Sequence, residues 1–114
     1  MNDTADSPEN QLQAMLRVLW RNNRAIIDER VQRLREAQTQ LSADQMDAAA
    51  RKEAESAAHK LAGVLGTFGL PEGSRIASSI ELLFAGDAPL DHYAQNDLAQ
   101  HLDELETIIA SKPA

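Results

Sequence analysis

The chain has 114 residues, of which 43% are hydrophobic and 25% charged, with no cysteine. This length suits one domain, and the absence of Cys excludes disulfide scaffolds, thiolate nucleophiles and Cys-based zinc sites. The formal net charge of -7 argues against binding to nucleic acid or to anionic lipid surfaces. No apolar run approaches the roughly 20 residues that span a bilayer, and no signal peptide is visible. We therefore expect a soluble, cytoplasmic protein that binds neither nucleic acid nor membrane.

The first predicted element is a long amphipathic helix. Residues 1–8 lack apolar periodicity and are predicted to form a flexible N-terminal tail. From Leu12 to Leu41, apolar residues recur every three or four positions, and a bundle interior would explain this stripe. The polar cluster 21–24 leaves two versions open: one helix of about nine turns, or a short helix followed by a longer one.

Three further helices follow. Ser42 and Gln45 have the spacing of a capping box, which predicts that the second helix begins there. Gly69, with Pro71 soon after it, is expected to end that helix and to precede a third. A fourth amphipathic helix is expected to begin between positions 91 and 96.

Each of these helices is apolar on one stripe only, so the stripes can be buried by packing the helices against one another. The predicted fold class is all-α. Residues 9–112 are expected to form an up-down antiparallel four-helix bundle, with an extra short N-terminal helix as the open alternative.

Two glycines inside the second helix indicate where a function lies. Gly63 and Gly66 each cost about 1 kcal/mol relative to Ala in a helix interior. At about 100° per residue, both lie within about 40° of His59 around the helix. The apolar side of this helix lies opposite, at Ala50, Ala54, Ala57, Leu61, Val64, Leu65 and Phe68. His59 is therefore expected to face solvent beside open space, where its ring could attack a phosphoryl group carried by another protein.

The run AAHKLAGVLGTFGL, residues 57–70, resembles the phosphorylation-site helix of the histidine-containing phosphotransfer (HPt) domains of bacterial multistep phosphorelays. The family pattern, H-x-L-K-G with further small residues and a Gly-Leu ending, is matched by His59, Leu61, Gly63, Gly66, Gly69 and Leu70. Downstream, Ser79-Ile80-Glu81 resembles the family's closing hydrophobic-Glu pattern.

The resemblance implies a phosphorelay carrier in two-component signal transduction. His59 would be phosphorylated on its outer nitrogen and would exchange the phosphoryl group with an aspartate of a response-regulator receiver domain or a hybrid histidine kinase. The receiver would supply Mg²⁺ and most of the catalytic groups, so this chain would be a phosphocarrier and not an enzyme. It would need no cofactor or metal site of its own.

The chain departs from the family pattern at one position. The family commonly has Lys three residues after the His, where this chain has Ala62. Lys60 is a candidate to neutralise the phosphoryl oxygens in its place, and a solvated surface lysine is the alternative. Gly63 and Gly66 would open the surface for the receiver. The candidate partner surface consists of Lys52, Glu55, Ser56, Ala62 and Arg75.

A rival hypothesis is a helical adaptor or dimerisation module in which the exposed histidine is incidental. A true enzyme is disfavoured, because the sequence shows no acid-base pair, metal-ligand set or phosphate-binding loop. The protein is expected to be monomeric, although the first long helix would also suit self-association.

Overall fold

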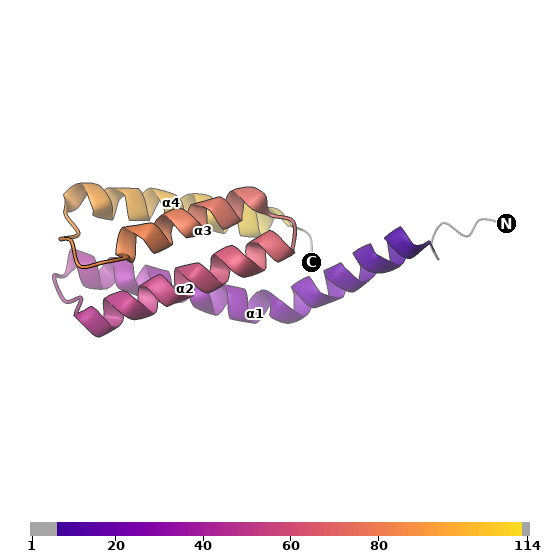
Figure 1. The fold of residues 1–114 in the computed structure, drawn as a ribbon, viewed down its shortest axis with the longest axis horizontal. Helices are drawn as coiled ribbons and strands as arrows, with labels where there is room; N and C mark the ends of the chain where they lie inside the picture. The colour runs from indigo at the N-terminus through magenta and orange to yellow at the C-terminus, as the bar shows by residue number, and fades with distance from the viewer. Residues whose placement is uncertain (1–6, 113–114) are drawn as a thin grey trace.

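The structure is a computed structural model that describes residues 7–112. It contains four helices: α1 (Pro8–Ser42), α2 (Ala48–Thr67), α3 (Pro71–Phe84) and α4 (His92–Ser111) (Figure 1). No strand is present in this part of the chain, which confirms the predicted all-α class. The first helix is one continuous element of 35 residues, so the separate short N-terminal helix does not form.

The helices are arranged as a four-helix bundle with up-down order. α1 packs against α2 and α4, and α3 packs against the same two helices, whereas within the described residues no Cα atoms of the diagonal pairs come within 8 Å of each other. This is the antiparallel bundle that the sequence predicts. The largest side chains sealed inside it are Trp20, Ile27, Leu34, Leu61, Leu65, Ile80, Phe84, Leu98, Leu102 and Leu105.

The apolar stripe of α1 differs from the prediction. Its buried face begins at Trp20 and continues through Ile27 and Leu34, whereas Leu12 and Leu19 are exposed. In Figure 1 the first turns of α1 extend past the end of the bundle and have no neighbouring helix to face, whereas Leu19 is exposed because it lies about 100° around α1 from the buried Trp20.

The N-terminus of α1 also lies earlier than predicted. The Ser7 hydroxyl accepts a hydrogen bond from the Asn10 amide at 3.2 Å, and Pro8 occupies the first turn, where its missing N–H costs nothing. Pro8 therefore belongs to the helix and not to a tail. The rest of the predicted tail, residues 1–6, lies outside the described residues.

The predicted start of the second helix is wrong. Ser42 is the last residue of α1, and the chain turns at Asp44, which has a φ of 54°. The Asp47 carboxylate caps α2 instead by accepting from the Ala50 amide at 2.7 Å. The capping-box pattern at Ser42 and Gln45 therefore does not form, because α1 continues through it.

A tight turn connects α2 to α3. Gly69 has a φ of 73°, which favours glycine, and its amide donates to the Gly66 carbonyl at 3.2 Å. The Leu70 amide donates to the Leu65 carbonyl at 2.9 Å, which completes a Schellman motif. Pro71 then begins α3. The predicted helix end at Gly69 is confirmed, and this tight turn brings α3 back directly alongside α2.

Arg35 joins α1 to α4 on the other side of the bundle. Its guanidinium donates to Asp103 Oδ1 at 2.7 Å and to Glu106 Oε1 at 2.6 Å. Partial burial acts to lower the pKa of Arg35, but the hydrogen bonds to these two carboxylates outweigh it and raise the pKa above its ordinary value. This contact connects helices that are far apart in the sequence.

Candidate functional site

His59 lies near the middle of α2 and faces solvent. Its side chain is 73% exposed, as the helical arithmetic predicts, whereas Ala58 and Leu61 beside it are fully buried. The backbone that carries the imidazole is therefore held by the core while the ring itself is open to a partner.

One contact orients the ring. His59 Nδ1 lies 2.9 Å from Oε2 of Glu81, which comes from the last turn of α3. An ionised carboxylate can only accept, so Nδ1 carries the proton and donates. In the neutral ring this leaves Nε2 unprotonated, with its lone pair available for nucleophilic attack.

Sequence reasoning found Glu81 only as part of a family pattern and gave it no role. The signal that could have located it was the tight turn at Gly69, which places α3 antiparallel to α2. Glu81 lies 22 residues after His59, so only the return of the chain through α3 brings the two side chains together.

Gly63 leaves open space one turn after His59. A Cβ at this position would meet no atom within 4 Å beyond its own helix and chain neighbours. Helix packing therefore does not require a glycine here. The exposed backbone beside the histidine remains accessible to a large partner.

The surroundings of Gly66 differ from the expectation that both glycines lie on the solvent side of α2 with His59. A Cβ there would meet the Ser74 Oγ of α3 at 3.4 Å, which is an ordinary contact distance. The Ser74 hydroxyl donates to the Ala62 carbonyl at 2.7 Å and joins the two helices. Gly66 thus lies at the edge between α2 and α3. The closest packing at a glycine is instead at Gly73, where a Cβ would lie 3.3 Å from Leu65 Cδ1.

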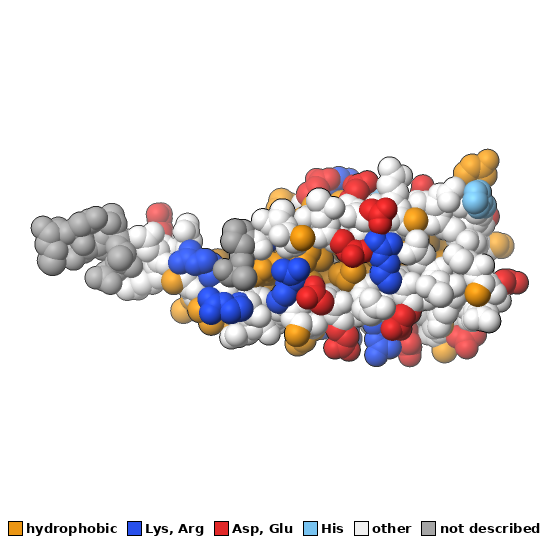
Figure 2. Space-filling model, turned by 180° about the vertical axis from the view of Figure 1, so that it is seen from behind, with side chains coloured by type: hydrophobic (Ala, Val, Ile, Leu, Met, Phe, Trp, Pro, Cys, Tyr) orange, Lys and Arg blue, Asp and Glu red, His pale blue; other side chains and the backbone are white. Residues whose placement is uncertain are grey.

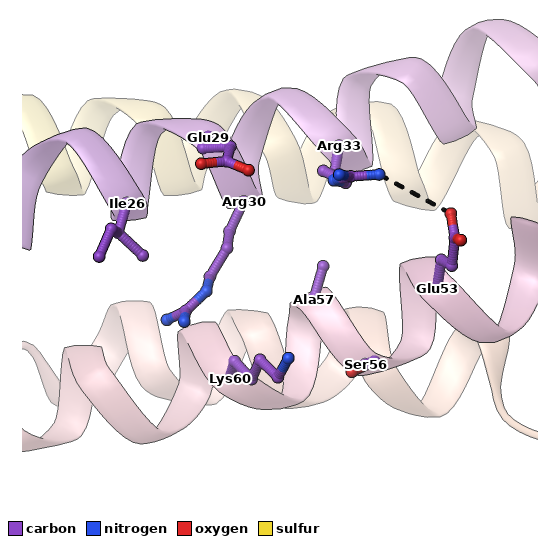
Figure 3. Close-up of a pocket in the computed structure, with 8 residues that line it drawn as sticks. All are labelled: Ile26, Glu29, Arg30, Arg33, Glu53, Ser56, Ala57 and Lys60. Atoms are coloured by element: carbon purple, nitrogen blue, oxygen red, sulfur yellow. Dashed lines mark ion pairs between the residues drawn. The ribbon is translucent and has the colours of Figure 1, made fainter.

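Lys60 lies on the other side of His59, in a groove between α1 and α2 with a volume of about 510 Å³ (Figure 3). Arg30 extends across this groove from α1 toward α2, and Arg33 pairs with Glu53 at 3.8 Å. Three cations and two carboxylates, Glu29 and Glu53, therefore line one groove beside the α2 turn that carries His59. Sequence reasoning missed both arginines, because they come from a different helix.

The comparisons with known proteins agree with this geometry. The family model described as Hpt domain matches residues 9–108, which span nearly the whole bundle and include both His59 and Glu81. The chain is a member of the Hpt domain family. Hpt domains are helical bundles that carry phosphoryl groups on histidine in phosphorelays and interact with receiver domains and kinases. The comparisons with curated proteins and with solved structures give no match.

The other residues of the candidate partner surface of this Hpt domain lie on α2 before His59 and on α3. Ser56 lines the groove with Lys60, and Glu55 is half-buried one turn before the histidine. Lys52 is exposed two turns before it. Arg75 is exposed on α3 and forms an ion pair with Glu72.

Ala62, at the position where the family commonly has Lys, is half-buried beside α3. Within residues 7–112 of this Hpt domain, no group of three or more His, Cys, Asp or Glu side chains could hold a metal ion. None of the described helices is both long and apolar enough to cross a membrane.

Proposed function

We propose that His59 is the phosphorylated residue of this Hpt domain and exchanges its phosphoryl group with an aspartate of a receiver domain. The observation that carries the proposal is the exposed ring whose Nδ1 donates to Glu81, because this contact leaves Nε2 as the nucleophile. A location in the cytoplasm, where such receivers are found, stays a prediction.

The transfer step balances without a cofactor bound to this chain. The Nε2 lone pair attacks the phosphorus of the aspartyl phosphate, an N–P bond forms, and the bond from phosphorus to the aspartate oxygen breaks. The aspartate leaves as a carboxylate with the electron pair. The receiver is proposed to supply Mg²⁺ and the other catalytic groups. The reverse step returns the phosphoryl group to a receiver aspartate.

Glu81 contributes through charge as well as orientation. The ring gains a positive charge when Nε2 bonds to phosphorus while Nδ1 keeps its proton. A carboxylate 2.9 Å from Nδ1 stabilises that charge as it develops. Glu81 is thus proposed as a positioning residue that acts on the reacting nitrogen through the ring.

Lys60 is proposed to neutralise the phosphoryl oxygens in place of the family's Lys, which this chain replaces with Ala62. Lys60 follows His59 directly and lies about 100° from it around α2, on the side of the groove that also holds Arg30. A phosphoryl group on Nε2 would thus lie between the carboxylate side of α3 and the cationic side facing α1.

The test is phosphotransfer from a labelled phospho-receiver in the presence of Mg²⁺. We expect acid-labile, base-stable label on this chain, lost in His59→Ala and retained in the control His92→Ala, which removes an exposed histidine of α4. Label that persists undiminished in His59→Ala would overturn the proposal. It would leave the helical adaptor as the better reading of the exposed histidine.

A further inference from the structure

α1 carries a second apolar surface that its own bundle does not cover. Leu12, Met15, Leu19 and Ile26 are 56%, 59%, 42% and 45% exposed. The first of these lie on the turns that extend past the bundle in Figure 1. Together with the exposed Asn22 they form what we call the α1 seam: Leu12, Met15, Leu19, Asn22 and Ile26.

The spacing of the α1 seam is that of a coiled coil. Its members alternate by three and four residues over two heptads, so they line one face of the helix at positions a and d. Trp20 and Ile27, which α1 buries in its own bundle, each follow an a position by one and lie about 100° away from it. The two stripes are therefore separate, and among residues 7–112 the other helices of the bundle cover only the stripe that contains Trp20.

The charges on α1 fit a second helix of the same kind. The positions that flank the α1 seam carry no charge: Gln11, Leu16, Val18, Asn23 and Ala25. Arg17, Arg21 and Arg24 lie on the opposite face instead, and Figure 2 shows basic side chains gathered where α1 leaves the bundle. Two copies can therefore meet along the α1 seam without like-charge repulsion, despite a net charge of -7 on each chain. An anionic lipid surface would instead favour these arginines at the edges of the apolar face.

Asn22 favours the parallel orientation of the two α1 helices. Asn22 occupies a d position, and in a parallel pair in register the two Asn22 amides face each other and can hydrogen-bond. In an antiparallel pair centred on Leu19, each Asn22 would face the apolar side chains near Met15 and leave an amide unpaired.

We propose that a second copy of this chain packs along the α1 seam and forms a short parallel two-stranded coiled coil. The extension is already helical because it continues a helix anchored in the bundle, so the cost of nucleating the helix does not oppose association. His59 and Glu81 lie on α2 and α3, and Ile26 is the one member of the α1 seam that lines the groove with Lys60.

Sedimentation equilibrium of the full chain over a range of concentrations tests the proposal. We expect a concentration-dependent rise from the 12.5 kDa monomer toward twice that mass. Met15→Lys/Leu19→Lys should stay monomeric throughout. The matched control Gln13→Lys/Ala14→Lys adds the same charge to exposed positions on the other face of the same turns and should dimerise like the wild type. Circular dichroism verifies that both variants keep their helix content.

Disulfide cross-linking tests the orientation, because the chain has no cysteine of its own. Met15→Cys should cross-link rapidly under mild oxidation in a parallel dimer, whereas Gln13→Cys, on the outer face, should not. Cross-linking at Leu19→Cys but not at Met15→Cys would show an antiparallel pair and overturn the parallel assignment.

Three results would overturn the dimer itself. One is a wild type that stays monomeric at the highest concentrations reached. Another is a dimer that survives Met15→Lys/Leu19→Lys. The third is a monomer whose binding to phosphatidylglycerol vesicles is abolished by the same double substitution, which would assign the α1 seam to a lipid surface.

Discussion

The two sides of this bundle use polar contacts between helices in different ways. On the α1 and α4 side, the Arg35 guanidinium is shared between two carboxylates, Asp103 and Glu106. On the α2 and α3 side, His59 gives one nitrogen to Glu81 while its ring stays largely exposed. The first contact connects two helices. The second contact leaves Nε2 of the exposed ring available, and this difference supports placing the proposed functional surface on the α2 and α3 side.

The largest expected effect on the phosphotransfer rate comes from breaking the contact between His59 and Glu81. Glu81→Ala should slow phosphotransfer roughly 100-fold, because the ring loses both its fixed tautomer and the charge that stabilises the phosphorylated form. Glu81→Gln, which can still accept from Nδ1, should fall between this variant and the wild type. Rapid-quench kinetics with a phospho-receiver measures both. Equal rates for Glu81→Ala and the wild type would show that the contact has no part in transfer.

A bulky side chain at the open position should block the approach of the receiver. Gly63→Leu should slow transfer about tenfold or more while the helix stays intact, since a Cβ there meets no neighbour. Gly63→Ala should raise the free energy of unfolding by about 1 kcal/mol. Ala110→Leu, on the exposed face of α4, is the control for added bulk. Transfer assays and urea unfolding measure the effects, and unchanged transfer in Gly63→Leu would show that the open space is unimportant.

Removing the contact of Arg35 with Asp103 and Glu106 should lower the free energy of unfolding and leave the phosphotransfer rate unchanged. Arg35→Ala should lower the free energy of unfolding by about 1 kcal/mol, a modest value because both carboxylates are partly exposed and screened by solvent. The loss should shrink in high salt. Urea unfolding at two salt concentrations measures it. A large fall in the transfer rate with stability unchanged would contradict the assigned scaffold role.

Among the variants expected to slow transfer, the smallest effect is that of Lys60→Ala. Lys60→Ala should slow transfer roughly threefold to tenfold through lost attraction to the phosphoryl oxygens, with the fold unchanged. Arg17→Ala removes one positive charge from an exposed position on α1, outside the candidate partner surface, and is the control. If both variants transfer phosphoryl groups at the same rate, Lys60 acts only through the net charge of the chain and not through the phosphoryl oxygens. The role proposed for it would then be wrong.

Sequence reasoning reached the features that depend on one helix at a time. The exposure of His59 follows from the 100° advance per residue, because the core side of the same helix is set by residues such as Leu61 and Leu65. The end of α2 follows from Gly69, whose backbone conformation is a local property. The all-α class follows from amphipathic periods in the same way.

Features that depend on the neighbouring helix were missed or mistaken. The pattern of α1 shows where apolar residues recur but not where the bundle ends, so the exposed Leu12 and Leu19 were assigned to its interior. Ser42 fits a helix start, yet continued α1 structure overrides that local preference. Gly66 seemed to face only solvent because its angle on α2 says nothing about Ser74 on α3.

The sequence by itself determined the four helices, the all-α class and the outward direction of His59, because helix periodicity and chain turns act over a few residues. Only the tertiary structure decided that Glu81 meets Nδ1, that Lys60 shares a groove with Arg30, and that Leu12, Met15 and Leu19 of α1 stay exposed among the described residues. These contacts join residues distant in sequence, and their distances depend on how the helices pack, which no local pattern encodes.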